Sequence, residues 1–574
     1  MEKITGKTAG KKNDFFRNRN GDPVFLTGLQ CHNSSVGTPM MNQTIEAIRL
    51  YGGNLLEAPV CWCDVEPEEG VYDMSPVQEL LDQAAGADLY LIPLWFGASK
   101  NGMYTYAPEY VKNNPAVYRR ARDGRGYPVA SFSACCEAVL ERDRAAFVRV
   151  MEYLAEHDTK GSVIAVQVEN EVGLAHTDRD YSPESEEEYC RPVPEYLRNI
   201  RLEDAYEPVN EPMREPVHEV ACEPAEEEAA ACNPAREDVP ARDSAFTWKS
   251  CFGRHSAEAF TAWQHACYIQ KLVEAGQEKL DVPYIMNISV EVNEYEEPGH
   301  CYISGGPVAR VLEIWKRTAP GITLFGPDIY LPAERDYREV CERYAQEDNP
   351  LFIPESSIHG TGAGLNMLTA VADYHAIGVC CFGAESAVQD GKLIPEAEET
   401  AVSMRAISSL APLLIRYRNT GRVYAVTQSE FSSWQHVLTE KYHVLARFLN
   451  QEKNRRGYFG SRINLYAEEN QEHLMRRGRC LIIDAGDGEF FAAGCGVCLE
   501  FIRRPEAAEE RAYEQIRTDV SSQMRFLSIE EGHFEDGGKW VCEYRRNGDE
   551  AYGPVYIHEG SAVRVRLEKP EKIW

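Results

Sequence analysis

The fold is decided by the stretch Val163-Ile164-Ala165-Val166-Gln167-Val168-Glu169-Asn170-Glu171-Val172-Gly173. Its aliphatic part follows Gly161-Ser162, and such a short apolar run is typical of a strand buried on both faces of a parallel sheet. The strand ends in Glu169-Asn170-Glu171, although burying a carboxylate costs free energy. Side chains at the carboxyl end of a parallel strand face the mouth of an α/β fold, where catalytic groups lie. We therefore expect these acids to belong to a functional site.

Further apolar segments alternate with helical patterns from about residue 24 to 390, which is typical of a parallel α/β fold. Eight candidate strands lie near Val24–Gly28, Asn54–Val60, Leu89–Leu94, Val163–Val168, Tyr284–Asn287, Ile322–Phe325, Leu351–Ile353 and Ile377–Val379. Eight such units in under 400 residues predict a (β/α)8 TIM barrel with enlarged loops.

Apolar residues recur at helical spacing in Asp143–Leu154, Phe260–Leu272 and Val308–Trp315, as expected of helices that cover a barrel. After a last helix near Glu398–Tyr417 the composition changes to short β-like runs separated by Gly, Asp and Asn. We predict a catalytic barrel over residues 1–418 and a C-terminal antiparallel β-sandwich over residues 419–574.

The charge of the chain restricts its partners. Ninety-one acidic residues against 60 basic ones give a formal net charge of −31, which argues against nucleic acid and against an anionic membrane surface. Much of the excess lies in an insertion at about residues 178–250, which includes Glu184–Glu188 and Glu219–Asp238. We interpret it as a solvated surface insertion, with a binding segment as the alternative.

Neither a signal peptide nor an apolar run long enough to cross a membrane is evident. The 18 cysteines are scattered, and pairs such as Cys380-Cys381 lie in strand-like contexts, so we expect reduced thiols and a cytoplasmic protein. Their spacing does not match a structural zinc site, so we expect no metal.

A second predicted strand also ends in acid, in Leu351-Phe352-Ile353-Pro354-Glu355. By the strand count, Glu171 and Glu355 follow strands four and seven, which face each other across the mouth of an eight-stranded barrel. A buried ion pair explains either acid taken alone. Glycoside hydrolysis needs both, because one group protonates the departing oxygen while the other attacks the anomeric carbon.

The motif Gln167-Val168-Glu169-Asn170-Glu171-Val172-Gly173 resembles the Gln-(Ile/Val)-Glu-Asn-Glu-Tyr-Gly signature of glycoside hydrolase family 35, the β-galactosidase family. The blocks Asn54–Asp73, Leu94–Gly102 and Gly326–Tyr330 resemble a bacterial branch of that family with a C-terminal β-domain. The resemblance implies a retaining β-galactosidase that acts on a carbohydrate and needs no cofactor.

Carried over residue by residue, the resemblance makes Glu171 the acid/base and Glu355 the nucleophile. Alternation along a strand places Glu169 and Glu171 on the same side, with Glu171 nearer the mouth. Asn170 is suited to bind a sugar hydroxyl, and Glu169 is either structural or a sugar contact.

The other strand ends supply further candidates for sugar binding. Tyr330 could donate a hydrogen bond to Glu355 and keep it ionised. Trp62, Trp95 or Phe382 could stack on a sugar, with packing at the barrel rim as the alternative. The remaining candidates at strand ends are His32, Asn33 and Asn287.

Two positions depart from the family pattern. Trp62-Cys63 stands where the pattern has Trp-Glu, so Cys63 replaces Glu, and Val172 replaces Tyr. We expect an exo-acting retaining β-galactosidase. Cys63 leaves open another β-glycoside (glucoside, fucoside or arabinopyranoside), and a non-catalytic sugar-binding protein is the alternative from another class. The sequence does not decide the linkage, the aglycone or whether the chain forms a homo-oligomer.

Overall fold

The computed structural model describes residues 15–202, 246–291, 297–430, 432–451, 476–504, 525–535, 537–551, 553–560 and 562–569. Most of the acidic insertion therefore lies outside the described residues. Its described flanks form α6 (Pro183–Tyr189) and α7 (Trp248–Phe252).

All eight predicted barrel strands form and pair in one parallel sheet of order β10-β9-β8-β5-β4-β3-β12-β11. They are β3 (Leu26–Gln30), β4 (Leu55–Cys61), β5 (Tyr90–Lys100), β8 (Val166–Asn170), β9 (Tyr284–Ser289), β10 (Ile322–Asp328), β11 (Phe352–Ile353) and β12 (Gly378–Phe382). The sheet closes between β10 and β11, where Ile329 forms a parallel bridge with Ser356 and its N–H donates to the Glu355 carbonyl at 2.9 Å. The prediction of a TIM barrel is confirmed.

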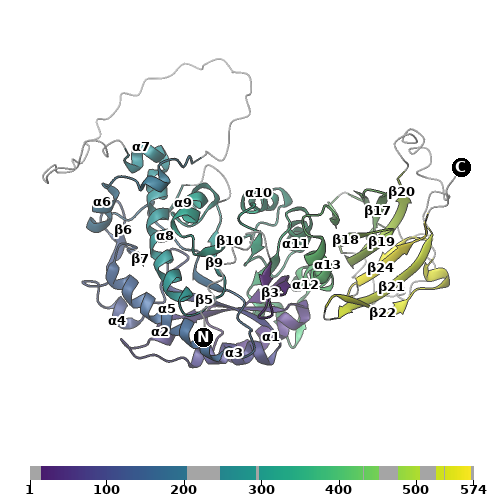
Figure 1. The fold of residues 1–574 in the computed structure, drawn as a ribbon, viewed down its shortest axis with the longest axis horizontal. Coiled ribbons are helices and arrows are strands. Elements are labelled where there is room, and N and C mark those ends of the chain that lie inside the picture. Colours follow the sequence, from purple (N-terminus) through teal and green to yellow (C-terminus); the bar gives the residue numbers. More distant parts are fainter. Residues whose placement is uncertain are drawn as a thin grey trace, which may run out of the picture.

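Helices cover the outside of this sheet, as the apolar stripes of the sequence predict (Figure 1). The main ones are α1 (Met40–Tyr51), α3 (Ser75–Gly86), α5 (Glu137–His157), α8 (Ser256–Gln277), α9 (Leu312–Thr318), α10 (Glu334–Tyr344), α11 (Thr361–Asp373), α12 (Pro395–Ser409) and α13 (Ala411–Tyr417). Short elements extend the loops, namely α2 (Trp62–Val65), α4 (Glu109–Lys112) and the hairpin β6 (Arg120–Arg122) and β7 (Pro128–Phe132).

Each barrel strand is buried on both faces, and alternate residues pack in two separate clusters. On β4, Leu55 and Cys61 pack inside the barrel, whereas Leu56, Ala58 and Val60 pack outward against the helices. This is why the strands read as continuous apolar runs rather than as alternating ones.

The C-terminal part consists of two antiparallel sheets, at the yellow end of Figure 1. One contains β15 (Val423–Thr427), β18 (Arg479–Gly486), β19 (Glu489–Cys495), β24 (Ala562–Leu567), β21 (Phe526–Glu535) and β22 (Lys539–Arg545). The other contains β16 (Trp434–Leu438), β17 (Tyr442–Phe448), β20 (Val497–Arg503) and β23 (Val555–Ile557).

Strand β18 joins the two parts of the molecule. Its Cys480 and Ile482 face the core between the two C-terminal sheets, while Leu481 and Ile483 face the barrel helices. Helices α11 and α12 pack on β15, β18 and β19. Arg479 is fully buried at this contact and pairs with Glu399 of α12. The β-sandwich is therefore continuous with the wall of the barrel.

Candidate active site

The carboxyl ends of four neighbouring strands bring acids and amides together at the barrel mouth. Glu171 follows β8, Asn287 lies on β9, Asp328 ends β10 and Glu355 follows β11. Asn287, Asp328 and Glu355 are 1%, 3% and 6% exposed. Charges so deeply buried interact strongly, because little water screens them.

Glu355 accepts hydrogen bonds on both of its carboxylate oxygens. The Tyr330 hydroxyl donates to Oε2 at 2.7 Å, and Nδ2 of Asn287 lies 3.1 Å from Oε1. The predicted contact of Tyr330 with Glu355 is therefore present. Burial, followed by the charge of Glu355, raises the pKa of Tyr330, so this hydroxyl stays a donor. The two donors hold both oxygens of Glu355 in place at the barrel mouth.

Asn287 connects the two predicted catalytic acids. Its Oδ1 accepts the backbone N–H of Glu171 at 3.0 Å, and its Nδ2 lies within 3.1 Å of acceptors on Asn170, Asp328 and Glu355. The sequence placed Asn287 among the sugar contacts, whereas the structure places it between the acids. Asn170 in turn donates to Asn101 at 3.0 Å, so both sides of its amide are bound within the protein.

The environment of Glu171 suits a proton donor. Burial first, and then the charge of Glu355, raises the pKa of Glu171 to about 7, while Lys100 opposes this shift. A carboxyl group with such a pKa is protonated in a substantial fraction of molecules at neutral pH. Glu171 can therefore give a proton to a leaving group and later accept one from water.

Glu169 does not share the side of Glu171, so the prediction from strand alternation is wrong at this position. Both residues have positive φ angles, 59° at Glu169 and 44° at Glu171, which interrupts the alternation. The Glu169 carboxylate accepts the backbone N–H groups of Gly97, Ala98 and Ser99 at 2.9, 2.8 and 3.1 Å. Its oxygens are thus held by β5 rather than offered to a sugar.

Lys100 and Asp328 belong to the site although the sequence reasoning did not select them. Lys100 ends β5, is 6% exposed, and its Nζ lies 4.5 Å from the Phe96 ring centroid. Burial lowers the pKa of Lys100, and the charges of Glu355, Glu171 and Asp328 raise it. Lys100 lies in the block Leu94–Gly102 and Asp328 in the block Gly326–Tyr330, both beyond predicted strands. Their place at a strand end is the feature of the sequence that indicates a role in the site.

Burial and the charges of Glu355 and Glu171 raise the pKa of Asp328 well above its ordinary value. Glu57 of β4 shows a similar effect. Burial first, and then the charge of Glu355, raises the pKa of Glu57 well above its ordinary value. Oδ1 of Asp328 and both carboxyl oxygens of Glu57 find no hydrogen-bond partner among the described residues. Burial therefore disfavours the charged form of both acids beside Glu355.

The two tryptophans selected as stacking candidates are buried, which corrects that expectation. Trp62 is 0% exposed and donates its Nε1 hydrogen to Glu66 at 2.8 Å. Trp95 is 1% exposed and donates to Asp143 of α5 at 2.9 Å. Both indoles belong to the hydrophobic cluster between the strands and the helices. The packing alternative therefore describes them.

The remaining candidates lie at the ends of β3 and β12. His32 is within 2.8 Å of Ser386 Oγ, and its ring meets Phe382 edge-on at 5.1 Å between centroids. Asn33 has a buried Oδ1 that forms no hydrogen bond with the described residues. His32, Asn33 and Phe382 are neither fully buried nor fully exposed, so they remain candidates for sugar contacts.

Cys63, which stands where the family pattern has Glu, is partly exposed beyond β4. Its N–H donates to the Tyr106 carbonyl at 2.8 Å, and its thiol lies 3.6 Å from Oδ1 of Asp64. Burial raises the pKa of this thiol to about 11, so Cys63 carries no charge at neutral pH. It cannot replace the carboxylate expected there.

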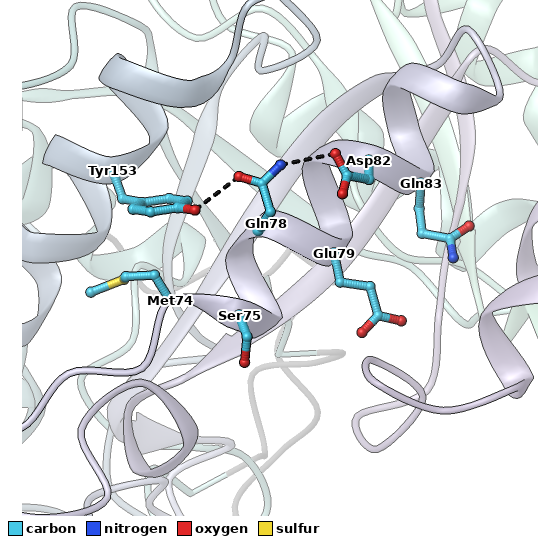
Figure 2. A pocket seen from close by; sticks show the side chains of 7 residues that line it. All are labelled: Met74, Ser75, Gln78, Glu79, Asp82, Gln83 and Tyr153. Carbon is cyan, nitrogen blue, oxygen red and sulfur yellow. Dashed lines mark hydrogen bonds between the residues drawn. The ribbon is translucent and has the colours of Figure 1, made fainter.

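A hollow of about 750 Å³ lies away from these acids, over α3 (Figure 2). Figure 2 shows Tyr153 of α5 donating to Gln78, which in turn donates to Asp82. Tyr153, Gln78 and Asp82 thus form one short chain of hydrogen bonds along the hollow. It contains none of the predicted site residues.

No group of three or more His, Cys, Asp or Glu side chains is placed to bind a metal ion within the described ranges. No helix in those ranges is both long and apolar enough to cross a membrane.

Comparison with known proteins matches two segments of the chain to family models. Residues 35–213 match the glycoside hydrolase family 42 model, described as β-galactosidase, and residues 403–555 match a domain of unknown function, DUF5597. The expectation of family 35 is therefore corrected, and the resemblance shown is to β-galactosidases of family 42. The first segment contains Glu171 and ends before Glu355.

Among individual proteins, a β-galactosidase of Xanthomonas manihotis is 28% identical over 180 residues, 30% of this chain and 28% of that protein. The chain thus matches little more than a quarter of its curated relative.

Solved structures give weaker matches. A β-galactosidase of Bacillus circulans sp. alkalophilus is 13% identical with a TM-score of 0.46, over 69% of this chain and 57% of its own. The family 42 β-galactosidase Gan42B of G. stearothermophilus is 13% identical with a TM-score of 0.47, over 70% of this chain and 59% of its own.

Proposed function

We propose that this chain is a glycoside hydrolase of the β-galactosidase type, which releases terminal β-D-galactose from oligosaccharides with retention of configuration. The observation that carries the proposal is the pairing of Glu171 and Glu355 at one mouth through Asn287. Their environments differ as the reaction requires, because Glu171 has a pKa near 7 while Glu355 accepts two hydrogen bonds. The matches to β-galactosidases support the same activity.

In the first step, Glu355 attacks the anomeric carbon and forms a covalent glycosyl ester, while Glu171 transfers its proton to the departing oxygen. In the second step, Glu171 accepts a proton from a water molecule. The oxygen of that water then displaces Glu355 from the anomeric carbon and restores both acids. The chemistry uses these two carboxyl groups and requires no cofactor.

Retention of configuration requires that the two carboxyl groups be about 5–5.5 Å apart, whereas inversion requires about 8 Å. This separation stays a prediction. Exo action and galactose as the sugar are likewise proposals, and the uncharged Cys63 leaves the choice of sugar open. Cytoplasmic location is supported by the cysteines of the described segments, which are all free thiols.

The proposal is tested with a panel of aryl β-glycosides (galactoside, glucoside, fucoside and arabinopyranoside), with Glu355→Gln beside the wild type. We expect the galactoside to be cleaved fastest and Glu355→Gln to lose at least about 1,000-fold in kcat/KM. NMR of the first product should show the β-anomer. An α-anomer would overturn the nucleophile assignment, and equal negligible rates for both proteins would leave a non-catalytic sugar-binding protein. Faster cleavage of another glycoside would correct the sugar.

A further inference from the structure

A second pair of carboxyl groups lies behind β8, on the side away from the mouth. Glu169 and Asp143 of α5 are both 0% exposed. Glu169 accepts the three successive N–H groups of residues 97–99, while Asp143 accepts the Trp95 indole N–H at 2.9 Å and the Tyr268 hydroxyl at 2.6 Å. Every donor here comes from β5 or α8.

The two carboxyl groups meet at Gly97. A Cβ atom at this position would lie 2.6 Å from Asp143 Oδ1 and 2.8 Å from Glu169 Oε1. No side chain fits there, which explains why glycine follows Trp95-Phe96 in the sequence. Oδ1 of Asp143 and Oε1 of Glu169 therefore both lie within 2.8 Å of one point beside Gly97. The interaction with Glu169 lowers the pKa of Asp143 but does not cancel the larger effect of burial, which raises it.

The hydrogen-bond donors around this pair are uncharged, and they offset only part of the cost of burying two negative charges. The groups that face it are Trp95 of β5 and Tyr268 and His265 of α8, and burial lowers the pKa of His265, so that its ring stays neutral. Burial raises the pKa of both acids, and the charge of Asp143 raises that of Glu169 further. Two neighbouring carboxyl groups in a buried site oppose each other's ionisation, so the second proton leaves at a higher pH than the first.

We propose that Glu169 and Asp143 hold one proton between them and act as a positioning pair, which fixes the end of β5 and thereby places Lys100 and Glu171 at the mouth. This inference rests on the proposed function, since it assigns supporting residues to the same site.

The pairing of β5 with β8 shows how this positioning works. Trp95 pairs with Val168 and then Lys100 pairs with Asn170, so residues 96–99 form a bulge between the two register positions. Glu169 holds the bulge by its three N–H groups. The N–H of Asn101 then donates to the Asn170 carbonyl at 2.9 Å. The positive φ angles that turn Glu169 toward the bulge also direct Glu171 to the opposite side.

The shared proton is tested by thermal unfolding between pH 5 and 9, which needs no enzymatic activity. The native pair keeps a proton that the unfolded chain releases near pH 4, so its contribution to stability is lost as pH rises through the raised native pKa. Asp143→Asn leaves one carboxylate, so we expect its Tm to fall less steeply with pH than that of the wild type. Other buried acids are unchanged in this variant.

Asp158→Asn is the matched control for this measurement. Asp158 follows the same helix α5, and its carboxylate accepts the N–H groups of Ser162 and Val163, at the start of the segment that leads into β8. The Tm of Asp158→Asn should change with pH as the Tm of the wild type does. If the Asp143→Asn curve is also parallel to the wild type, the shared proton is refuted.

Positioning is tested by kinetics on the best aryl glycoside. In Glu169→Gln the side-chain NH₂ group faces at least one backbone N–H, and two donors cannot form a hydrogen bond with each other. In Asp143→Asn the amide oxygen still accepts a hydrogen bond from one of the two donors. We expect Glu169→Gln to lower kcat at least about 100-fold, and Asp143→Asn no more than about 10-fold. A folded Glu169→Gln enzyme with kcat within threefold of wild type would overturn the positioning role.

The outcomes separate this inference from the proposed function. If the wild type cleaves no glycoside, the proposed function fails while the unfolding curves still decide whether the proton is shared. If Glu169→Gln does not fold, the Asp143→Asn unfolding curve and its kcat decide the inference.

Discussion

Nδ2 of Asn287 lies 3.1 Å from Oε1 of Glu355, while Oδ1 of the same amide accepts the backbone N–H of Glu171 at 3.0 Å. One side chain on β9 therefore sets the position of the proposed acid relative to the proposed nucleophile. The site depends on this amide as much as on the acids, because a displacement of reacting groups by about 1 Å is enough to lose much of the rate.

Replacing Asn287 by Ala should lower kcat/KM about 100-fold or more, because Glu355 loses a donor and Glu171 loses its backbone anchor. Asn349→Ala is the control. Asn349 is an equally buried amide that accepts the Phe325 N–H at 2.9 Å, behind the site. It should lower Tm and leave kcat/KM near wild type. Equal kinetic losses in the two variants would show that Asn287 acts only through stability.

Glu171→Gln should show a strong dependence on the leaving group, because a good leaving group departs without a proton. We expect kcat/KM to fall about 1,000-fold for a disaccharide but less than about 10-fold for a dinitrophenyl glycoside. The measurement is kcat/KM along a series of aryl glycosides of rising leaving-group pKa. A uniform loss along the series would show that Glu171 is not the proton donor.

The pH profile of kcat/KM should fall as pH rises through about 7, because Glu171 must be protonated to donate and burial raises its pKa to about 7. Lys100 lowers the pKa of Glu171, so Lys100→Met should move this fall to higher pH. Lys100→Arg keeps the positive charge and should leave the fall near its wild-type position. A fall that moves to lower pH in Lys100→Met would contradict the assignment of Glu171 as the titrating acid.

Tyr330→Phe removes the 2.7 Å hydrogen bond to Glu355 and should lower kcat about 10- to 100-fold. Tyr337→Phe is a matched control, because this buried hydroxyl forms no hydrogen bond with the described residues. It should leave both kcat and Tm close to wild type. If Tyr330→Phe keeps full kcat, the hydroxyl does not stabilise the reacting carboxylate.

Glu399→Ala should destabilise the contact between barrel and C-terminal sheets by about 3 kcal/mol, because it leaves the guanidinium of Arg479 buried without a carboxylate. The double variant Glu399→Ala with Arg479→Leu removes the unpaired charge and should recover part of that loss. Urea unfolding of the three proteins measures both effects. A double variant less stable than Glu399→Ala would show that Arg479 stabilises by packing rather than through its charge.

Much of the architecture could be predicted from the sequence, because the cues for strands and helices are local. Each of the eight expected apolar segments became a strand of the barrel sheet, and the acids of Glu171 and Glu355 follow the fourth and seventh of them. Parallel strands in one sheet bring their carboxyl ends to one edge. The meeting of these acids at the mouth therefore followed from counting strands.

The family was less predictable, because the matching model is that of family 42 and the expected family was 35. The expected family and the matched family are both described as β-galactosidases. A short motif around the two acids is compatible with more than one family of the same architecture.

The sequence by itself determined where the strands lie along the chain and that Glu171 and Glu355 follow two of them. Only the tertiary structure decided which way the side chains at those ends face. Glu169 turns away from the mouth, where the backbone N–H groups of residues 97–99, distant in sequence, hold its carboxylate. Trp95 faces α5, where its indole N–H donates to Asp143. Alternation is a rule of regular strands, and it fails where contacts from other elements fix a bulge.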